Sequence, residues 1–258
     1  MTDHAPAPPV LALRGLRKQF GQKVAVDGLS LDVPAGSMLG VLGPNGAGKT
    51  TTLAMTTGLL RPDAGSAWVL GHDVWQDPAR AKALMGVLPD GIRMLDRLTG
   101  AELLRYTGLL RGMPEAEVHT RTGELLDALG LGDDRDTLVV DYSAGMRKKI
   151  GLACALIHAP RLLLLDEPLE AVDPVSGQTI RQILRAFVDS GGTVVLSSHV
   201  MELVESMCDR VAIVAEGRLL AHGELDEVRA GMTLQQRFLS LVGAHDLGTE
   251  TLAWLRSS

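Results

Sequence analysis

The fold class of this sequence is decided by the stretch Gly43-Pro44-Asn45-Gly46-Ala47-Gly48-Lys49-Thr50. It is a complete G-x-x-x-x-G-K-T phosphate loop, placed between an apolar run at 37–42, which predicts a buried strand, and a predicted helix at 49–60. Glycines let the backbone curl until successive N–H groups point at phosphate oxygens, and the helix directs the positive end of its dipole there. A Gly-rich turn that only caps a helix is the weaker alternative, because strand, loop and helix follow in the required order. We therefore expect residues 43–51 to bind a nucleoside triphosphate.

The side chains at the end of this loop are expected to complete the phosphate site. Lys49 brings a positive charge to the β and γ phosphates, and the Thr50 hydroxyl is suited to bind Mg²⁺. Thr51 follows in the same first helical turn and is included in the predicted nucleotide site.

An acidic pair, Asp166 and Glu167, directly follows four leucines at 162–165. The leucines predict a buried strand, and ligands of open α/β sheets bind at the carboxyl ends of the strands. We expect Asp166 to hold Mg²⁺ through water and Glu167 to polarise the attacking water as general base. Taken alone, the pair could equally be the acidic end of a strand. Beside a phosphate loop the catalytic interpretation is favoured.

A third motif, Tyr142-Ser143-Ala144-Gly145-Met146, begins a predicted helix about twenty residues before the acidic pair. Ser143 is a good N-cap, so the backbone N–H groups behind it form an anion site. An ordinary helix cap explains this motif as well when it is considered by itself.

Taken in this order, the three motifs resemble the nucleotide-binding domain of ABC transporters, whose signature usually reads Leu-Ser-Gly-Gly-Gln. The resemblance covers nearly the whole chain. It implies that Ser143 and Gly145 receive the γ-phosphate of an ATP held by the opposite subunit. Two copies, or a pseudo-symmetric pair, are then expected to enclose two ATP and two Mg²⁺.

The resemblance also assigns roles to three residues outside these motifs. Phe20 falls where the family stacks an aromatic ring on adenine, although a core phenylalanine is a serious alternative. Asp173 matches the D-loop residue that reaches across the dimer. His199 matches the switch histidine that contacts the γ-phosphate and the attacking water, and its place after a predicted strand supports a site role over a structural one.

Three positions depart from the family pattern. Asp90 stands where a glutamine is expected, so it is shorter by one carbon, or roughly 1.5 Å, and carries a carboxylate in place of an amide. We expect Asp90 to contact Mg²⁺ less directly or through water. Ala144 and Ala171 replace family glycines, which requires a negative φ at both positions.

The predicted fold class is α/β: a P-loop NTPase core of RecA-like type with a parallel sheet, an N-terminal antiparallel β subdomain and an inserted all-helical subdomain. We expect a loose tail at 1–9, an ATPase domain at 10–232 and a helical tail at 233–258. Within the domain, 10–92 and 159–232 form the core with its β layer, and 93–158 form the helical insert. Alternation of apolar and polar residues predicts antiparallel strands at 10–33, and short apolar runs predict strands of a parallel sheet at 162–165, 193–196 and 211–214. Apolar residues at helical intervals predict helices at 102–110, 115–129 and 143–157.

Composition narrows the class of protein. The 258 residues suit one α/β domain with a lobe, and the net charge of -6 disfavours a nucleic-acid partner. Cys154 and Cys208 have apolar neighbours and no metal-type spacing, so we expect two unpaired cysteines in a reducing cytoplasm. No apolar run approaches the ~20 residues that cross a bilayer, and the N-terminus lacks the pattern of a signal peptide.

The function expected from the resemblance is that of an ATP-hydrolysing subunit that drives a separate transmembrane permease, an exporter, at the cytoplasmic face of the membrane. The alternatives are a soluble ABC-type ATPase acting on nucleic acid or ribosomes, and a nucleotide sensor without turnover. The basic run 147–149 is the only feature that favours nucleic acid, and a solvated helix face explains it equally well.

Overall fold

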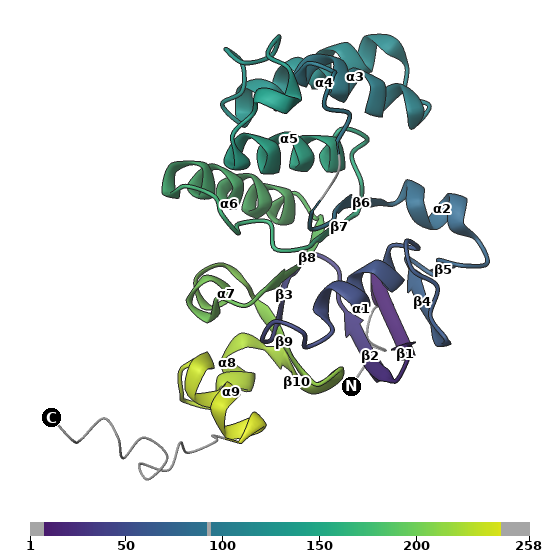
Figure 1. Ribbon diagram of the computed structural model, residues 1–258, viewed down its shortest axis with the longest axis vertical. Helices are drawn as coiled ribbons and strands as arrows, with labels where there is room; N and C mark the ends of the chain where they lie inside the picture. Colours follow the sequence, from purple (N-terminus) through teal and green to yellow (C-terminus); the bar gives the residue numbers. More distant parts are fainter. Residues whose placement is uncertain (1–7, 92–93, 244–258) are drawn as a thin grey trace, which may run out of the picture.

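The computed structural model describes residues 8–91 and 94–243, and Figure 1 shows how its helices and strands are arranged. A six-stranded sheet forms the centre, in the order β10-β9-β3-β8-β7-β6. Its strands are β3 (Met38–Leu42), β6 (Met85–Leu88), β7 (Leu162–Leu165), β8 (Thr193–Ser198), β9 (Arg210–Ala215) and β10 (Arg218–Glu224). All neighbours are parallel except β10, which runs antiparallel to β9. The central strands are aliphatic along their length because helices cover both faces of a parallel sheet.

A second, antiparallel sheet lies beside the first, in the order β2-β1-β4-β5. Its strands are β1 (Leu11–Phe20), β2 (Lys23–Val33), β4 (Ala64–Val69) and β5 (His72–Asp73). The helix α1 (Lys49–Thr56) fills the space between the two sheets, where Leu53 and Met55 pack in one buried cluster with Leu11 of β1 and Val41 of β3. This packing fixes the phosphate loop, since α1 begins directly after it.

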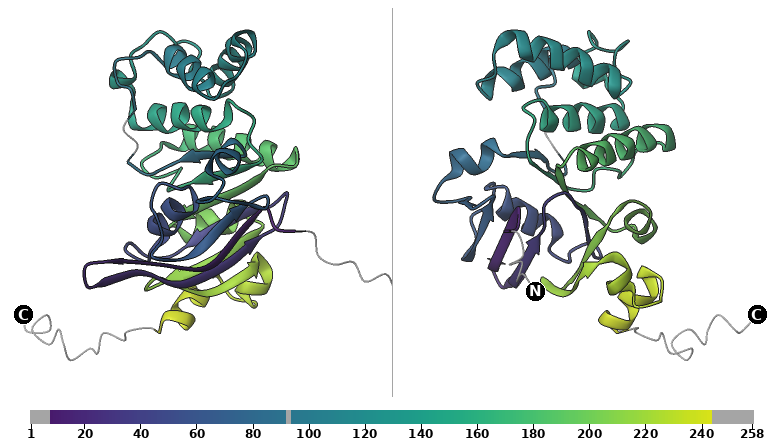
Figure 2. Two further views of the ribbon diagram at one scale, coloured as in Figure 1. Left: turned by 90° about the vertical axis from the view of Figure 1, so that its right-hand side faces the viewer. Right: turned by 180° about the vertical axis from the view of Figure 1, so that it is seen from behind.

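Three helices form a group at one end of the molecule, as the two views of Figure 2 show. They are α3 (Gly100–Leu110), α4 (Glu115–Ala128) and α5 (Ala144–Leu156), with a short 3-10 helix at Val139–Asp141 before α5. The Thr99 hydroxyl and the Glu102 carboxylate close a capping box that fixes the start of α3. Close contact between α5 and β6 connects the group to the sheet, because Gly86 of β6 leaves room for the Ala155 carbonyl.

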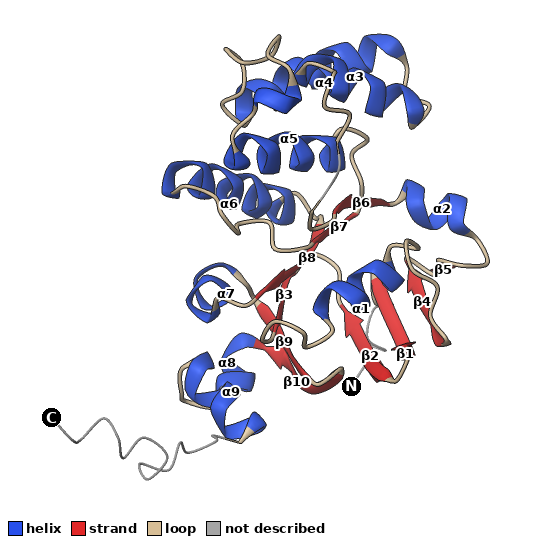
Figure 3. Ribbon diagram, in the orientation of Figure 1, coloured by secondary structure: helices blue, strands red, loops and turns tan. Residues whose placement is uncertain are grey.

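The remaining helices lie around the two sheets (Figure 3). They are α2 (Pro78–Ala83), α6 (Pro174–Asp189), α7 (Met201–Met207), α8 (Leu225–Arg229) and α9 (Leu234–Val242). The helices α6 and α7 pack on the central sheet, α8 and α9 lie beyond β9 and β10, and α2 lies beside β5 and β6. The helix α6 buries Ile180, Leu184 and Val188, spaced four residues apart, so its apolar stripe faces the core. Within the described ranges 8–91 and 94–243, no helix combines the length and apolar character needed to pass through a bilayer.

Most expected elements are confirmed, with small shifts at their ends. The strands predicted at 10–33, 37–42, 162–165, 193–196 and 211–214 are present, as are the three helices predicted between 102 and 157. The helix predicted at 49–60 ends at Thr56. The strands β4, β5, β6 and β10 were not expected. The predicted start of the helical insert at residue 93, most of the N-terminal tail and the end of the C-terminal tail lie outside the described residues.

Candidate nucleotide-binding and hydrolysis site

Three neighbouring strands end at the same edge of the central sheet and deliver the predicted site residues there. In β3, Leu42 lies opposite Ser198 of β8, and in β7, Leu165 lies opposite Leu196 of β8. The segments that follow these strands therefore lie close together: the phosphate loop, the Asp166-Glu167 pair and His199. Residues more than 120 positions apart in the sequence are assembled by the register of three strands.

Two glycines of the phosphate loop are required by packing as well as by phosphate approach. A Cβ on Gly43 would lie 2.2 Å from the Val214 carbonyl oxygen of β9. Gly48 has φ of 103°, and a Cβ there would lie 2.4 Å from the Ala25 carbonyl oxygen of β2. Any larger residue would push the loop away from both sheets.

The loop borders an open cleft of ≈ 440 Å³. The cleft is lined by loop residues from Pro44 to Thr51 and by Phe20, Lys23, Ala25, Asp90, Glu167 and Glu170. Phe20 is 50% exposed at its margin, so the alternative of a core phenylalanine is wrong. The Lys18 ammonium lies 5.7 Å from the ring centroid, on one face of Phe20.

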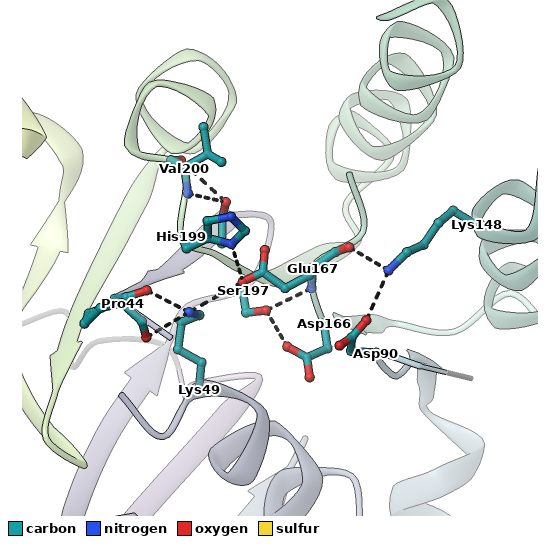
Figure 4. Close-up of polar contacts among 11 residues, drawn as sticks. Pro44, Lys49, Asp90, Lys148, Asp166, Glu167, Ser197, His199 and Val200 are labelled. Atoms are coloured by element: carbon teal, nitrogen blue, oxygen red, sulfur yellow. Dashed lines mark hydrogen bonds and ion pairs between the residues drawn. The ribbon is translucent and has the colours of Figure 1, made fainter. Parts of the chain in front are cut away.

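A chain of ionisable side chains crosses the cleft floor (Figure 4). The Glu167 carboxylate lies 3.5 Å from Lys49 Nζ and 3.1 Å from His199 Nδ1. Lys49 also donates to the Gly43 carbonyl at 2.7 Å, which holds its side chain over the loop. Lys49 and Glu167 are 6% and 9% exposed, so their attraction is little screened by water. The three residues predicted for hydrolysis are therefore brought together.

Ser197 joins the Asp166 carboxylate to the Glu167 backbone and was not predicted. Its hydroxyl donates to Asp166 Oδ1 at 2.5 Å and accepts from the Glu167 backbone N–H at 2.9 Å. The sequence signal was its place, two residues before His199 and at the end of a predicted strand. The hydroxyl fixes both residues relative to β8.

Oxygen atoms suited to Mg²⁺ line a small cavity beside the cleft. This cavity, of ≈ 50 Å³, is bordered by Thr50, Asp90 and Asp166 among other residues. A hydroxyl and two carboxylates are hard oxygen donors of the kind that bind Mg²⁺. The residues present fit the ion, and Thr50 and Asp166 lie where the sequence places them.

Lys148 of α5 is a second residue that sequence reasoning missed. Its Nζ donates to the Glu167 carbonyl at 2.8 Å and lies 3.5 Å from Asp90 Oδ1 (Figure 4). The side chain is 18% exposed, and Lys149 is 9% exposed. The prediction that 147–149 form a solvated helix face is therefore wrong for Lys148 and Lys149, which turn into the protein, whereas the Arg147 side chain is 40% exposed. The same burial removes the one feature that favoured nucleic acid.

The signature motif starts α5 as expected but lies outside the cleft. Ser143 Oγ accepts from the Met146 N–H at 3.2 Å and caps the helix. Of the part of the chain that the structure describes, the residues lining the cleft include neither Ser143 nor Gly145. A Cβ on Gly145 would lie 3.2 Å from Asp173 Oδ2, so the signature faces the D-loop residue of its own chain.

Asp173 caps α6, with its carboxylate accepting from the Val175 and Ser176 N–H groups. The bond from the Ser176 N–H lowers the pKa of this carboxyl below its ordinary value. Ala171, just before it, has φ of 56°, so the expectation of a negative φ is wrong at this position, whereas Ala144 is helical. Ala171 therefore holds a left-handed conformation that glycine adopts more readily.

Comparison with known proteins agrees with this geometry. The ABC transporter family model matches residues 26–170, more than half of the chain. The daunorubicin/doxorubicin resistance ATP-binding protein DrrA of Streptomyces peucetius is 42% identical over 218 residues, which are 84% of this chain and 66% of DrrA. The linearmycin resistance ATP-binding protein LnrL of Bacillus subtilis is 36% identical over 214 residues, 83% of this chain and 69% of LnrL. The chain thus spans about two thirds of the length of these relatives.

A solved structure gives the same answer for the fold. The ATP-binding subunit of an ABC transporter superposes with a TM-score of 0.84 at 27% identity, covering 90% of this chain and 99% of that one. Its fold confirms the predicted α/β P-loop class with an ABC-type arrangement of sheets and helices. This chain belongs to the ABC transporter family, as one of its ATP-binding and ATP-hydrolysing domains.

Proposed function

We propose that this chain is the ATP-driven subunit of an exporter and that Glu167 is its general base. The observation that carries the catalytic part is the position of the Glu167 carboxylate, between Lys49 and His199 at the mouth of the phosphate loop. A carboxylate there can accept a proton from a water aligned with the γ-phosphate.

The residues around the γ-phosphate divide the work of hydrolysis. Backbone N–H groups of 43–51 hold the phosphates, and the Lys49 ammonium neutralises their charge. Glu167 takes the proton of the attacking water, and His199 orients that water and the γ-phosphate. Thr50 and Asp166, with Asp90 less directly, would hold Mg²⁺, which supplies further charge neutralisation on the phosphate oxygens when bound. Phe20 stacks on adenine at the cleft margin.

We place two copies of the chain around two ATP molecules. The cleft is open to the surface, and its lining does not include the capped start of α5 within the described residues. Ser143 and Gly145 of one copy would complete the cleft of the other with backbone N–H groups and a helix dipole. Asp173 would lie between the two sites. Binding of ATP closes this dimer and hydrolysis reopens it.

The work of this cycle would pass to a separate permease at the cytoplasmic face of the membrane. Support comes from the two resistance proteins above, which the chain resembles over most of its length. A permease would dock beside Asp90 and residues 98–102, near both the ATP site and α3. The proposed export is tested by measuring drug efflux from vesicles that contain the permease and this chain, with and without ATP.

The variant Glu167→Gln tests the catalytic part. It should bind ATP, form a stable dimer seen as a doubled mass by light scattering, and release phosphate at least about 100 times more slowly than the wild type. Rapid phosphate release by this variant would remove Glu167 from its role. A monomer at saturating ATP, with or without the permease, would contradict the shared site.

A further inference from the structure

Lys148 connects three parts of the chain that are distant in sequence. It lies on α5, five residues after Ser143, and its ammonium reaches both the Asp90 carboxylate and the Glu167 carbonyl. Asp90 follows β6, and Glu167 follows β7. The helix that carries the signature is therefore tied by one side chain to the backbone of the proposed catalytic residue.

The backbone of Glu167 needs such support. Its φ is 45°, in the left-handed region that residues with a Cβ rarely adopt and that costs free energy unless neighbours enforce it. The N–H on one side is held by Ser197 Oγ at 2.9 Å. The carbonyl on the other side is held by Lys148 Nζ at 2.8 Å and by the Glu170 N–H at 3.2 Å. Both peptide groups that flank the Glu167 side chain are thus fixed.

We propose that Lys148, itself held by Asp90, is a positioning residue that sets the direction of the Glu167 carboxylate. The inference rests on the proposed role of Glu167 as general base. Lys148 acts through the peptide group, since its ammonium binds the carbonyl oxygen and leaves the carboxylate free for Lys49 and His199. The Asp90 carboxylate lies 3.5 Å from the Lys148 ammonium, and this ion pair keeps the ammonium against the Glu167 carbonyl. A small shift of α5 relative to β6 would then turn the catalytic carboxylate.

The test compares Lys148→Met, which keeps the length of the side chain and removes the donor, with Lys148→Arg, which keeps a donor. Lys148→Met should lower kcat for phosphate release about 10-fold, because a misplaced catalytic group loses its alignment with water. Its dissociation constant for ATP should change less than about twofold, since the phosphate loop is untouched. Lys148→Arg should keep kcat within about threefold of the wild type.

The matched control is Arg121→Met. Arg121 also pairs with a carboxylate, that of Glu117, and donates to a carbonyl, that of Ile157 at 2.8 Å, but it lies in the helical group away from the cleft. Loss of these contacts should lower the melting temperature about as much as Lys148→Met does and leave kcat unchanged. A second control combines Lys148→Met with Glu167→Gln, where no further loss of the residual rate is expected, because Lys148 acts through Glu167.

The outcomes separate the two claims. Wild-type kcat in Lys148→Met, with slow turnover in Glu167→Gln, overturns the positioning role alone. Equal losses of kcat in Lys148→Met and Lys148→Arg, or a further loss in the double variant, assign Lys148 a general structural role and also overturn the inference. Wild-type turnover in Glu167→Gln refutes the proposed base, and the inference falls with it.

Discussion

The nucleotide cleft and the start of α5 are both predicted to bind phosphate, but only the cleft brings ionisable side chains into contact within one chain. On the cleft floor, the Glu167 carboxylate contacts Lys49 and His199, and Lys49 and Glu167 are buried. At the start of α5, Ser143 makes only its own helix cap, and Asp173 likewise caps α6. The first region is a closed network of side chains, and the second is a pair of helix caps that meet at Gly145.

This difference has a physical reason. A buried charged group that has no partner in the folded chain lowers the stability of the fold by several kcal/mol. Exposed helix caps are satisfied by their own backbone and by water, and they keep N–H groups that can still receive an anion. If the site is divided between two copies, the buried charged groups of the cleft must therefore be paired within one chain. The helix start that receives the anion can be capped by its own side chain and stay accessible.

The largest effect is expected from a mixed dimer, in which one copy is changed in the cleft and the other is changed at the start of α5. Lys49→Met and Ser143→Arg should each lower phosphate release about 100-fold on their own, because each removes charge or donors at the γ-phosphate of both sites. Mixed together, the two inactive proteins should regain roughly a quarter of wild-type turnover, since half of the dimers are mixed and each of those has one intact site.

A control mixture shows whether the regain has the proposed cause. Lys49→Met and Glu167→Gln both lie in the cleft half of the site, so their mixture leaves every site damaged and should stay inactive. No regain in the first mixture would mean that Ser143 acts within its own chain, and regain in the second would mean that Lys49 and Glu167 serve different sites. Phosphate release at saturating ATP and equal protein concentrations measures both.

The cleft network itself is broken by Ser197→Ala. The substitution leaves the buried Glu167 N–H without its partner and frees the Asp166 carboxylate. We expect a loss of about 1–3 kcal/mol in the free energy of unfolding, measured by urea denaturation, and a drop in kcat of about 10-fold. Thr193→Val on the same strand removes only the bond from the Gly36 N–H and should destabilise without slowing turnover. Equal slowing by both variants would contradict a specific role for Ser197.

The same contrast explains what could be predicted from the sequence. The phosphate loop and the acidic pair are short motifs whose chemistry requires residues at fixed spacing, and the strand before each motif is strongly apolar. His199 follows from its place after a strand. These predictions were confirmed as positions in the fold, because the parallel register brings the strand ends together. Their roles in the reaction stay predictions.

Ser197 and Lys148 could not be predicted, because their partners come from other elements. Lys148 sits in a basic run that is typical of an exposed helix face, and only the packing of α5 on β6 turns it inward. Two of the four unexpected strands, β6 and β10, were missed for local reasons. β6 has few residues and a central glycine, which weakens its pattern, and β10 is an edge strand whose residues are all at least partly exposed.

A smaller effect is expected from Asp90→Gln, which restores the residue usual in the family. Asp90 lines the cleft and pairs with Lys148 of α5, so it lies between the two regions. The amide oxygen can still accept from Lys148, and the longer side chain reaches closer to the Mg²⁺ ligands by roughly 1.5 Å. We expect hydrolysis to be kept or raised, by no more than about threefold. Loss of all phosphate release in this variant would refute the indirect role of Asp90. Asp90→Ala, which removes the acceptor for Lys148, should be slower than Asp90→Gln.

The smallest effect is expected from a change at Asp173, the exposed residue that caps α6 near Gly145. Its pKa lies below the ordinary value of 3.8, chiefly because the Ser176 N–H donates to the ionised carboxyl. A lowered folded-state pKa stabilises the protein above pH 3.8, and this contribution is lost as the pH falls through the folded-state value. Asp173→Asn keeps a helix cap without the charge. Its melting temperature should therefore lie slightly below that of the wild type at neutral pH, and the two should converge under acid. A constant difference across the whole pH range would show that the charge of Asp173 does not stabilise α6. The ATP-bound dimer would then be the place to look for its role.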